Sequence, residues 1–241
     1  MLHVDRALDR AIDAWLAAPG PAARPPADVA LLGLYEQRVG RLLARRPTLL
    51  AAVARLLPRP VAAEVRTNAN ATADLLSLLT PSRDAPELVL GPPTPIGNLL
   101  RWYRRAERRF GIGAELLASI HLVETKFSRV RSHSSAGAQG PMQFIPSTWA
   151  AYGLGGDVRD DRDAIMGAAN YLRASGAPQD LRGAVFAYNH ATPYVDAVLG
   201  YARQMARDPR ALFGYYSWQV YGLTTEGDVR LSGPGSDGPA R

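Results

Sequence analysis

Apolar residues recur every three or four positions along most of the chain, the spacing that places them on one face of a helix. The first part of the chain is predicted to form helices at 4–18, 27–45 and 61–79, with another that begins at Pro47. The later part is predicted to form helices at 96–109, 113–127, 146–152, 163–174, 181–188 and 193–207. The fold class that follows is mainly α.

Start and stop signals accompany several of these helices. Asp163 and Asp180 are predicted N-caps, and Thr192 is a third because Pro193 after it suits the first helical turn. Gly153 is the predicted stop of the short helix before it.

Proline and glycine interrupt the pattern in two places. The stretch from Gly20 to Pro26 is predicted to be a linker, and the segment 81–95, with five prolines and a glycine, marks a domain boundary. We therefore expect a helical N-terminal region at 1–88 and a second helical domain at 96–207.

The pattern changes again near the C-terminus. From Tyr215 the chain carries short aromatic and β-branched runs, and Trp218–Leu223 and Val229–Leu231 predict a small hairpin with Gly227 in its turn. The last ten residues are predicted to be a flexible tail. Together these form a third part, 208–241.

The composition of the chain excludes several classes of functional site. The chain has 241 residues and no cysteine, which excludes disulfides, zinc–thiolate sites and thiol nucleophiles. No stretch approaches the ~18 apolar residues of a membrane span, and the charged N-terminus has no apolar core of a secretory signal.

The formal net charge of +6 suits a polyanionic partner, such as nucleic acid, an acidic membrane or an anionic wall polymer. The arginines are scattered and Lys126 is the sole lysine, so we expect no nucleic-acid partner and attribute the arginines to genome composition. The histidines lack metal-ligand spacing, and the aspartates between 157 and 163 suit a solvated turn better than a calcium loop. We expect no metal and no cofactor.

One helix carries a carboxyl group in an unusual position. Leu116, Ile120, Val123 and Phe127 form its apolar face, and Glu124 projects to the edge of that face. Partial burial would raise the pKa of such a carboxyl group and suit it to general-acid catalysis. From the helix alone, an ion pair with Arg129 or Arg131 is the more ordinary interpretation.

The segment after this helix is rich in serine and glycine, which suits close approach of a polar ligand such as a sugar. Three ordered motifs follow one another here: Glu124–Phe127, then Ser135–Gln143, then Ala187-Tyr188-Asn189. Over roughly residues 97–207 they resemble the soluble lytic transglycosylase domain family, which is goose-type lysozyme-like. The C-terminal hairpin is similar to the tail of actinobacterial members.

The resemblance implies a role for each matched residue. Glu124 matches the catalytic glutamate, and substrate-binding positions match Ser134 or Ser135, Gln143, Tyr188 and Asn189. The sequence departs from the family pattern in three places: Thr125 where serine is usual, Pro141 where leucine is usual, and His190-Ala191 where Ala-Gly is more usual. None of these removes a catalytic group.

The implied activity is cleavage of the MurNAc–GlcNAc β-1,4 bond of peptidoglycan with formation of 1,6-anhydro-MurNAc. No acidic residue lies between Glu124 and Asp157, so the adjacent loop offers no second carboxylate of the kind that two-carboxylate glycosidases use. Family members are thought to rely on the sugar's own 2-acetamido group. Asp157, Asp160 or Asp161 folding into the cleft would instead favour a hydrolytic muramidase.

Two further alternatives concern binding. The protein could be a non-catalytic wall-binding protein, although an intact Glu124 argues against it, or its N-terminal half could be an interaction module. Arg41, Arg45 and Arg46 could then meet an anionic wall polymer or a membrane surface, with a solvated helix face as the simpler interpretation. The expected partner is peptidoglycan and the expected state a monomer. From this function, not from the N-terminus, we expect a location outside the cytoplasmic membrane.

Overall fold

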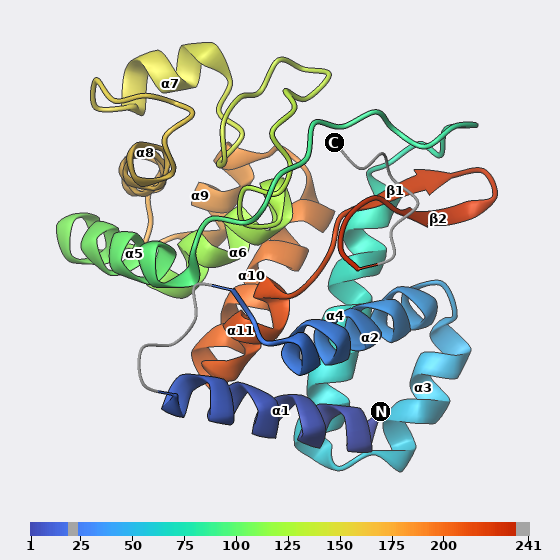
Figure 1. The fold of residues 1–241 in the computed structure, drawn as a ribbon. Coiled ribbons are helices and arrows are strands. Elements are labelled where there is room, and N and C mark those ends of the chain that lie inside the picture. Colours follow the sequence, from blue (N-terminus) through green and yellow to red (C-terminus); the bar gives the residue numbers. More distant parts are fainter. Residues whose placement is uncertain (19–23, 235–241) are drawn as a thin grey trace.

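The protein is described by a computed structural model over residues 1–18 and 24–234. This part is mainly helical, with a small antiparallel hairpin near its end (Figure 1), which confirms the predicted fold class. The predicted linker lies partly, and the predicted tail mostly, outside these ranges. The helices and strands are α1 Leu2–Ala17, α2 Ala27–Ala44, α3 Pro47–Leu56, α4 Arg59–Ser77, α5 Ile96–Phe110, α6 Ala114–Thr125, α7 Pro146–Tyr152, α8 Asp161–Ala174, α9 Leu181–Tyr188, α10 Thr192–Arg207, α11 Arg210–Tyr216, β1 Tyr221–Thr224 and β2 Gly227–Arg230.

The helix termini confirm some predicted signals and correct others. Asp180 caps α9 by accepting a hydrogen bond from the backbone N–H of Gly183, and Gly153 follows the last residue of α7. For α8 the N-cap is Asp160, whose carboxylate accepts from the N–H of Asp163. The prediction of Asp163 was wrong because α8 begins earlier, at Asp161, so that Asp163 lies inside its first turn.

Two other features of the second half differ from prediction. The N-cap of α10 is Ala191, because Thr192 is already helical, and no side chain caps that end. Helix α11 was not predicted, since its aromatic sequence resembles the strand-like run that follows it. Its Phe213, Tyr215 and Tyr216 are buried in the core.

One continuous apolar core joins the N-terminal helices to the later ones. Ile12 and Trp15 of α1 belong to the same buried cluster as Leu117 of α6 and Val198 of α10. Helix α10 packs against both α4 and α6, so it connects the two halves (Figure 1). The division at 88 and 96 remains a prediction about domain organisation.

The hairpin is fastened to α2 by a double ion pair. The Asp228 carboxylate accepts two hydrogen bonds each from Arg41 and Arg45, at 2.6–2.8 Å. Burial alone would raise the pKa of Asp228, but these bonds lower it to about 2. Arg41 and Arg45 are therefore both paired with Asp228, and a contact of this side of α2 with an anionic polymer stays a prediction.

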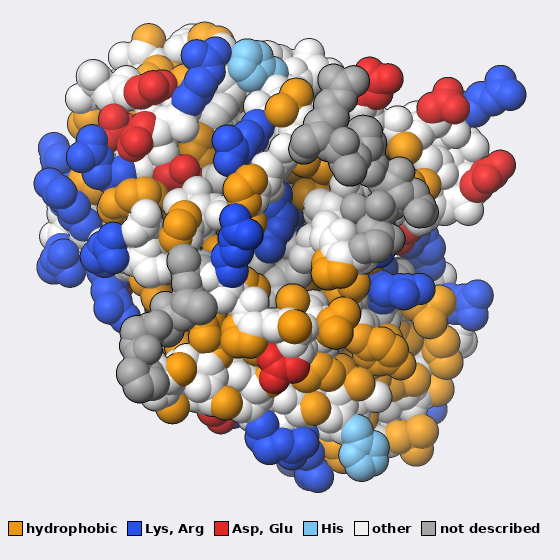
Figure 2. Space-filling view, viewed as in Figure 1, with side chains coloured by type: hydrophobic (Ala, Val, Ile, Leu, Met, Phe, Trp, Pro, Cys, Tyr) orange, Lys and Arg blue, Asp and Glu red, His pale blue; other side chains and the backbone are white. Residues whose placement is uncertain are grey.

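Arginine side chains gather instead over α5, at the left of Figure 2. Within the described ranges, every helix is too short or too polar to cross a bilayer.

Two carboxyl groups meet inside the N-terminal half. Glu36 of α2 and Glu64 of α4 are hydrogen-bonded to each other, and Glu36 also accepts bonds from Asn68 and Trp218 at 3.0 and 3.3 Å. Burial raises the pKa of both groups, to about 7 for Glu36 and about 9 for Glu64, and the charge of Glu36 raises that of Glu64 further, so the buried pair retains a shared proton.

This pair predicts a loss of stability at alkaline pH. The folded protein holds protons that the unfolded chain releases above pH ~4.5, so the free energy of unfolding should fall as pH rises from about 5 to about 9. Glu64→Gln should flatten this dependence, as measured by urea unfolding at several pH values. The exposed control Glu87→Gln should leave it unchanged, and an equally steep dependence in Glu64→Gln would contradict the assignment.

Candidate active site

Glu124 lies in the last turn of α6, where the helix ends in an unusual turn. Lys126, Phe127 and Ser128 all have left-handed backbone conformations, with φ of 52°, 59° and 70°. The helix therefore stops at Thr125, and the predicted extension to 127 was wrong. Left-handed conformations cost non-glycine residues roughly 1–2 kcal/mol each, so the surrounding contacts must hold this turn in place.

Thr125 supplies two of those contacts. Its buried hydroxyl donates to the carbonyl of Pro141 at 2.7 Å and accepts from the N–H of Ser128 at 3.1 Å. Phe127 is fully buried between the rings of His121 and Tyr216. The turn after Glu124 is thus fixed to the loop that carries the second sequence motif.

That loop is itself tightly folded. Gln139 and Phe144 pair as an isolated antiparallel bridge, and Gln143 between them has a φ of 50°. Its amide Nε2 donates to the carbonyl of Gly140 at 3.0 Å. Gly140 also has a positive φ, and a Cβ there would lie 1.8 Å from the carbonyl oxygen of Val158. Only glycine allows this close approach.

These elements border a cleft of about 570 Å³, a volume typical of ligand sites. One side comes from α6, the following loop and the ends of α9 and α10, and the other from α2, α4 and the hairpin. The lining residues are Gln37, Arg41, Thr72, Leu75, Leu76, Leu78, Leu79, Leu88, Val123, Glu124, Lys126, Val130, Ser132, His133, Ser134, Gln143, Asn189, Tyr194, Tyr201, Trp218, Gln219, Val220, Tyr221 and Leu223.

Among the described residues that line the cleft, Glu124 supplies the one carboxyl group. Tyr194 of α10 donates a hydrogen bond to Glu124 Oε1 at 2.5 Å. Loss of hydration raises the pKa of Glu124 to about 7, although the Tyr194 bond and the charge of Lys126 both act to lower it. A carboxyl group with this pKa keeps a large share of its proton at neutral pH, which a general acid requires.

Arg129 and Arg131 do not neutralise Glu124. Arg129 is buried and donates to the carbonyls of Lys126 and Tyr216, at 3.1 and 2.8 Å. Arg131 lines a separate cavity. The structure therefore does not support an ion pair between Glu124 and either of these arginines.

The aspartates that could have supplied a second carboxylate lie elsewhere. Asp161 accepts hydrogen bonds from Thr94 and Ser128, and Asp157 and Asp160 accept backbone N–H groups near the start of α8. None of the three lines the cleft, where Glu124 is the single acidic side chain among the residues that the structure describes.

The predicted binding residues are placed differently from one another. Ser134, Gln143 and Asn189 line the cleft with Glu124. Ser135 is exposed and is not part of the lining. Tyr188 lies behind the lining, where its hydroxyl donates to the carbonyl of Met142 at 2.7 Å and its ring packs against Phe144 and Tyr171.

Sequence reasoning missed several parts of the cleft. Tyr194 has no motif of its own, and its position just after Thr192-Pro193 was the only signal available. The leucines of α4 and the hairpin residues Tyr221 and Leu223 also line the cleft. The hairpin reaches the cleft because Asp228 holds it against α2.

The fold and the cleft define a helical protein whose cleft holds one part-buried carboxyl group, that of Glu124, beside hydroxyl and amide side chains. Comparison with known families agrees with the resemblance that the motifs carry: residues 101–209 match the model of the transglycosylase SLT domain. A search of curated proteins gave no match. Among solved structures, the chain is similar to the Escherichia coli lytic transglycosylase SLT35 in complex with bulgecin A. The two are 14% identical, with 85% of this chain and 92% of that one covered and a TM-score of 0.37.

The raised pKa of Glu124 predicts that the acid reduces stability at alkaline pH. Its folded-state pKa is above the ordinary value of 4.5. The free energy of unfolding is therefore highest at low pH and falls as the pH rises from about 4.5 through about 7. Glu124→Gln cannot ionise and should raise the melting temperature by a few degrees at pH 8.5, with little effect at pH 5.

Thermal unfolding of both proteins at the two pH values tests this. Glu115→Gln, in the first turn of the same helix, is the matched control and should show no such pH-dependent difference. An equal effect of Glu124→Gln at pH 5 and pH 8.5 would be inconsistent with a buried, protonated Glu124.

Proposed function

We propose that this protein is a peptidoglycan lytic transglycosylase in which Glu124 acts first as general acid and then as general base. The observation that carries the proposal is the cleft itself. It offers one carboxyl group, with a pKa raised to about 7, and no second carboxylate among its described lining residues. The match of residues 101–209 to the transglycosylase SLT domain supports the substrate class.

The first step needs a proton donor. Glu124 gives its proton to the oxygen of the scissile MurNAc–GlcNAc bond as the bond to the anomeric carbon breaks. Because the cleft supplies no carboxylate nucleophile, the 2-acetamido oxygen of N-acetylmuramic acid attacks the anomeric carbon and forms an oxazolinium ion. The leaving sugar departs as a neutral alcohol.

The second step needs a base in the same position. The Glu124 carboxylate takes the proton from the 6-hydroxyl of the same muramic acid, and O6 attacks the anomeric carbon. The oxazolinium ring opens, the acetamide is restored, and Glu124 regains its proton. The product is a 1,6-anhydro sugar, and water is not consumed.

The surroundings of Glu124 suit both steps. A pKa near 7 lets the group exchange one proton at neutral pH, and Tyr194 holds one carboxyl oxygen so that the other is free to face the substrate. Ser134, Gln143 and Asn189 offer hydroxyl and amide groups to a glycan in the cleft, and Tyr188 supports the loop from behind. This substrate implies action outside the cytoplasmic membrane.

The products of purified peptidoglycan distinguish this proposal from hydrolysis. Mass spectrometry should detect muropeptides lighter by one water than the reducing forms. Glu124→Gln should lower their rate of formation by at least about 10²-fold, because the acid is removed while the shape of the cleft is retained. Glu115→Gln is the control and should keep wild-type activity.

Three results would overturn the assignment. Reducing-end products would mean that water is the acceptor, as in a muramidase. Unchanged release by Glu124→Gln would mean that Glu124 is not the acid, and a folded wild-type protein that binds peptidoglycan without any release would be a wall-binding protein.

Tyr194→Phe tests the hydrogen bond that tunes Glu124. The Tyr194 hydroxyl lowers the pKa of Glu124, so its removal should raise that pKa further. The alkaline limb of kcat/KM, which falls as Glu124 loses its proton, should move to higher pH by about one unit or less. The control Tyr35→Phe, on the exposed face of α2, should leave the limb in place. A downward shift in Tyr194→Phe would contradict this role.

A further inference from the structure

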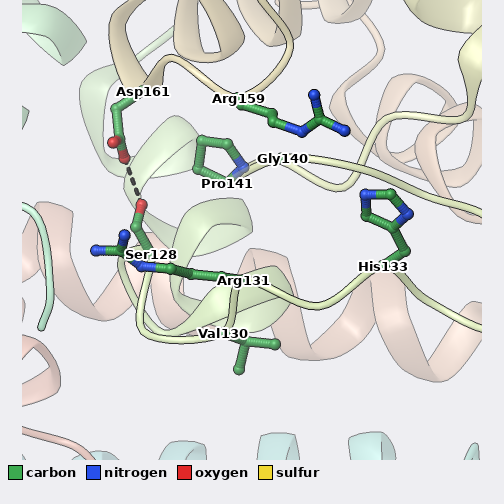
Figure 3. Close-up of a pocket in the computed structure, with 8 residues that line it drawn as sticks. All are labelled: Ser128, Val130, Arg131, His133, Gly140, Pro141, Arg159 and Asp161. Atoms are coloured by element: carbon green, nitrogen blue, oxygen red, sulfur yellow. Dashed lines mark hydrogen bonds between the residues drawn. The ribbon is translucent and has the colours of Figure 1, made fainter. Parts of the chain in front are cut away.

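A second cavity, of about 230 Å³, adjoins the cleft. It is lined by Ser128, Val130, Arg131, His133, Gly140, Pro141, Arg159 and Asp161, and we call it the basic pocket (Figure 3). Val130 and His133 line both the basic pocket and the cleft, so the two spaces are neighbours across the same loop.

Arg159 and His133 occupy one end of the basic pocket, where both side chains lie beside Gly140 (Figure 3). The backbone next to Arg159 rests directly on this glycine, since a Cβ on Gly140 would lie 1.8 Å from the carbonyl oxygen of Val158. Gly140 therefore brings Arg159 to the loop that also forms one side of the cleft.

Arg131 occupies the opposite end, near Ser128 and Asp161 (Figure 3). Its backbone N–H donates to the carbonyl of Val89 at 2.9 Å, and its guanidinium lies over Gly91, where a Cβ would be 2.4 Å from Nε. A second glycine thus creates the space for a second guanidinium.

The charges of the basic pocket do not cancel. Its one carboxylate, Asp161, accepts hydrogen bonds from the hydroxyls of Thr94 and Ser128. Burial lowers the pKa of the neighbouring His121, so this imidazole is neutral at neutral pH. Neither Arg131 nor Arg159 forms an ion pair with any residue that the structure describes. Two guanidinium groups and one carboxylate leave a positive site for an anion.

The walls indicate the kind of anion. Guanidinium groups bind carboxylates through paired, charge-assisted hydrogen bonds. Val130 and Pro141 add apolar surface that suits a small aliphatic group beside the charge. A short peptide with a free carboxylate and alanine-like side chains has this combination, whereas the carboxylate of a glycan without peptide is only the lactyl group of its muramic acid.

We propose that the basic pocket binds a carboxylate of the peptide stem of peptidoglycan while the glycan that bears the stem lies in the cleft. This inference rests on the proposed function for its substrate. Arg159 and His133 contact the carboxylate, and Arg131 adds positive charge from the far end. The basic pocket then selects glycan that still carries its peptides.

Equilibrium binding tests the proposal without need of catalysis. Isothermal titration calorimetry would use the Glu124→Gln protein and three ligands: a disaccharide–tetrapeptide muropeptide, the same muropeptide with its carboxyl groups converted to methylamides, and the disaccharide without peptide. The muropeptide with free carboxylates should bind about tenfold more tightly than its methylamide form, the effect expected of one charge-assisted pair.

Arg159→Gln, made in the Glu124→Gln background, should remove that tenfold difference and leave the affinity for the methylamide form unchanged. Arg104→Gln, an exposed arginine of α5 that carries the same charge change, is the matched control and should preserve the difference. Added salt should reduce the difference as well.

Several outcomes would overturn the proposal. These are equal binding of the free and methylamide forms, an equal loss for both in Arg159→Gln, or no binding of the muropeptide at millimolar concentration. If the disaccharide without peptide shows the same dependence on Arg159, the bound anion is the lactyl carboxylate and the peptide assignment is wrong. Anhydro products from the wild-type protein report separately on the catalytic proposal, so either can fail without the other.

Discussion

The loss of hydration around Glu124 is the interaction on which the other features of the site depend. An exposed glutamate at neutral pH would be ionised and could not act as an acid. Here the end of α6 meets α10, and the N-terminal helices and the hairpin close over the same space, so the carboxyl group keeps little water. One hydrogen bond, from Tyr194, takes the place of part of that hydration and prevents a still larger rise in pKa.

This arrangement requires segments that are far apart in the chain. Helix α4 supplies leucines to the cleft wall, and the hairpin supplies Tyr221 and Leu223. The Arg41 and Arg45 bonds to Asp228 fasten the hairpin to α2, so an electrostatic contact outside the cleft determines where one of its walls lies. The N-terminal region is therefore part of the site and not only an attached module.

Local strain is concentrated on either side of the acid. Three consecutive left-handed residues follow Thr125, and Gln143 is left-handed in the facing loop. These conformations are unfavourable for residues with side chains, and they persist because Thr125 and Phe127 are buried and bonded in one arrangement. The strained turn aims Lys126 and Glu124 into the cleft together.

Much of this organisation could be predicted from the sequence, and the remainder depends on tertiary contacts. Helical periodicity located ten of the helices, because amphipathic spacing is a local property. Glu124 and Gln143 were predicted from motifs carried on short, continuous segments. Tyr194, the leucine wall and the Arg41–Asp228 contact were not, since each depends on which distant segments pack together. Tyr188 was expected to face the ligand, and its bond to Met142 shows that a motif residue can support a loop from behind.

The most direct test of the account is the pKa of Glu124 itself. Proteins labelled with ¹³C at the glutamate side-chain carboxyl would be titrated by NMR, and the signal absent from Glu124→Gln would identify the residue. The account predicts a midpoint near pH 7 that coincides with the alkaline limb of kcat/KM. A midpoint near 4.5 would show that Glu124 is ionised throughout the neutral range, and a single buried acid could not then drive the reaction.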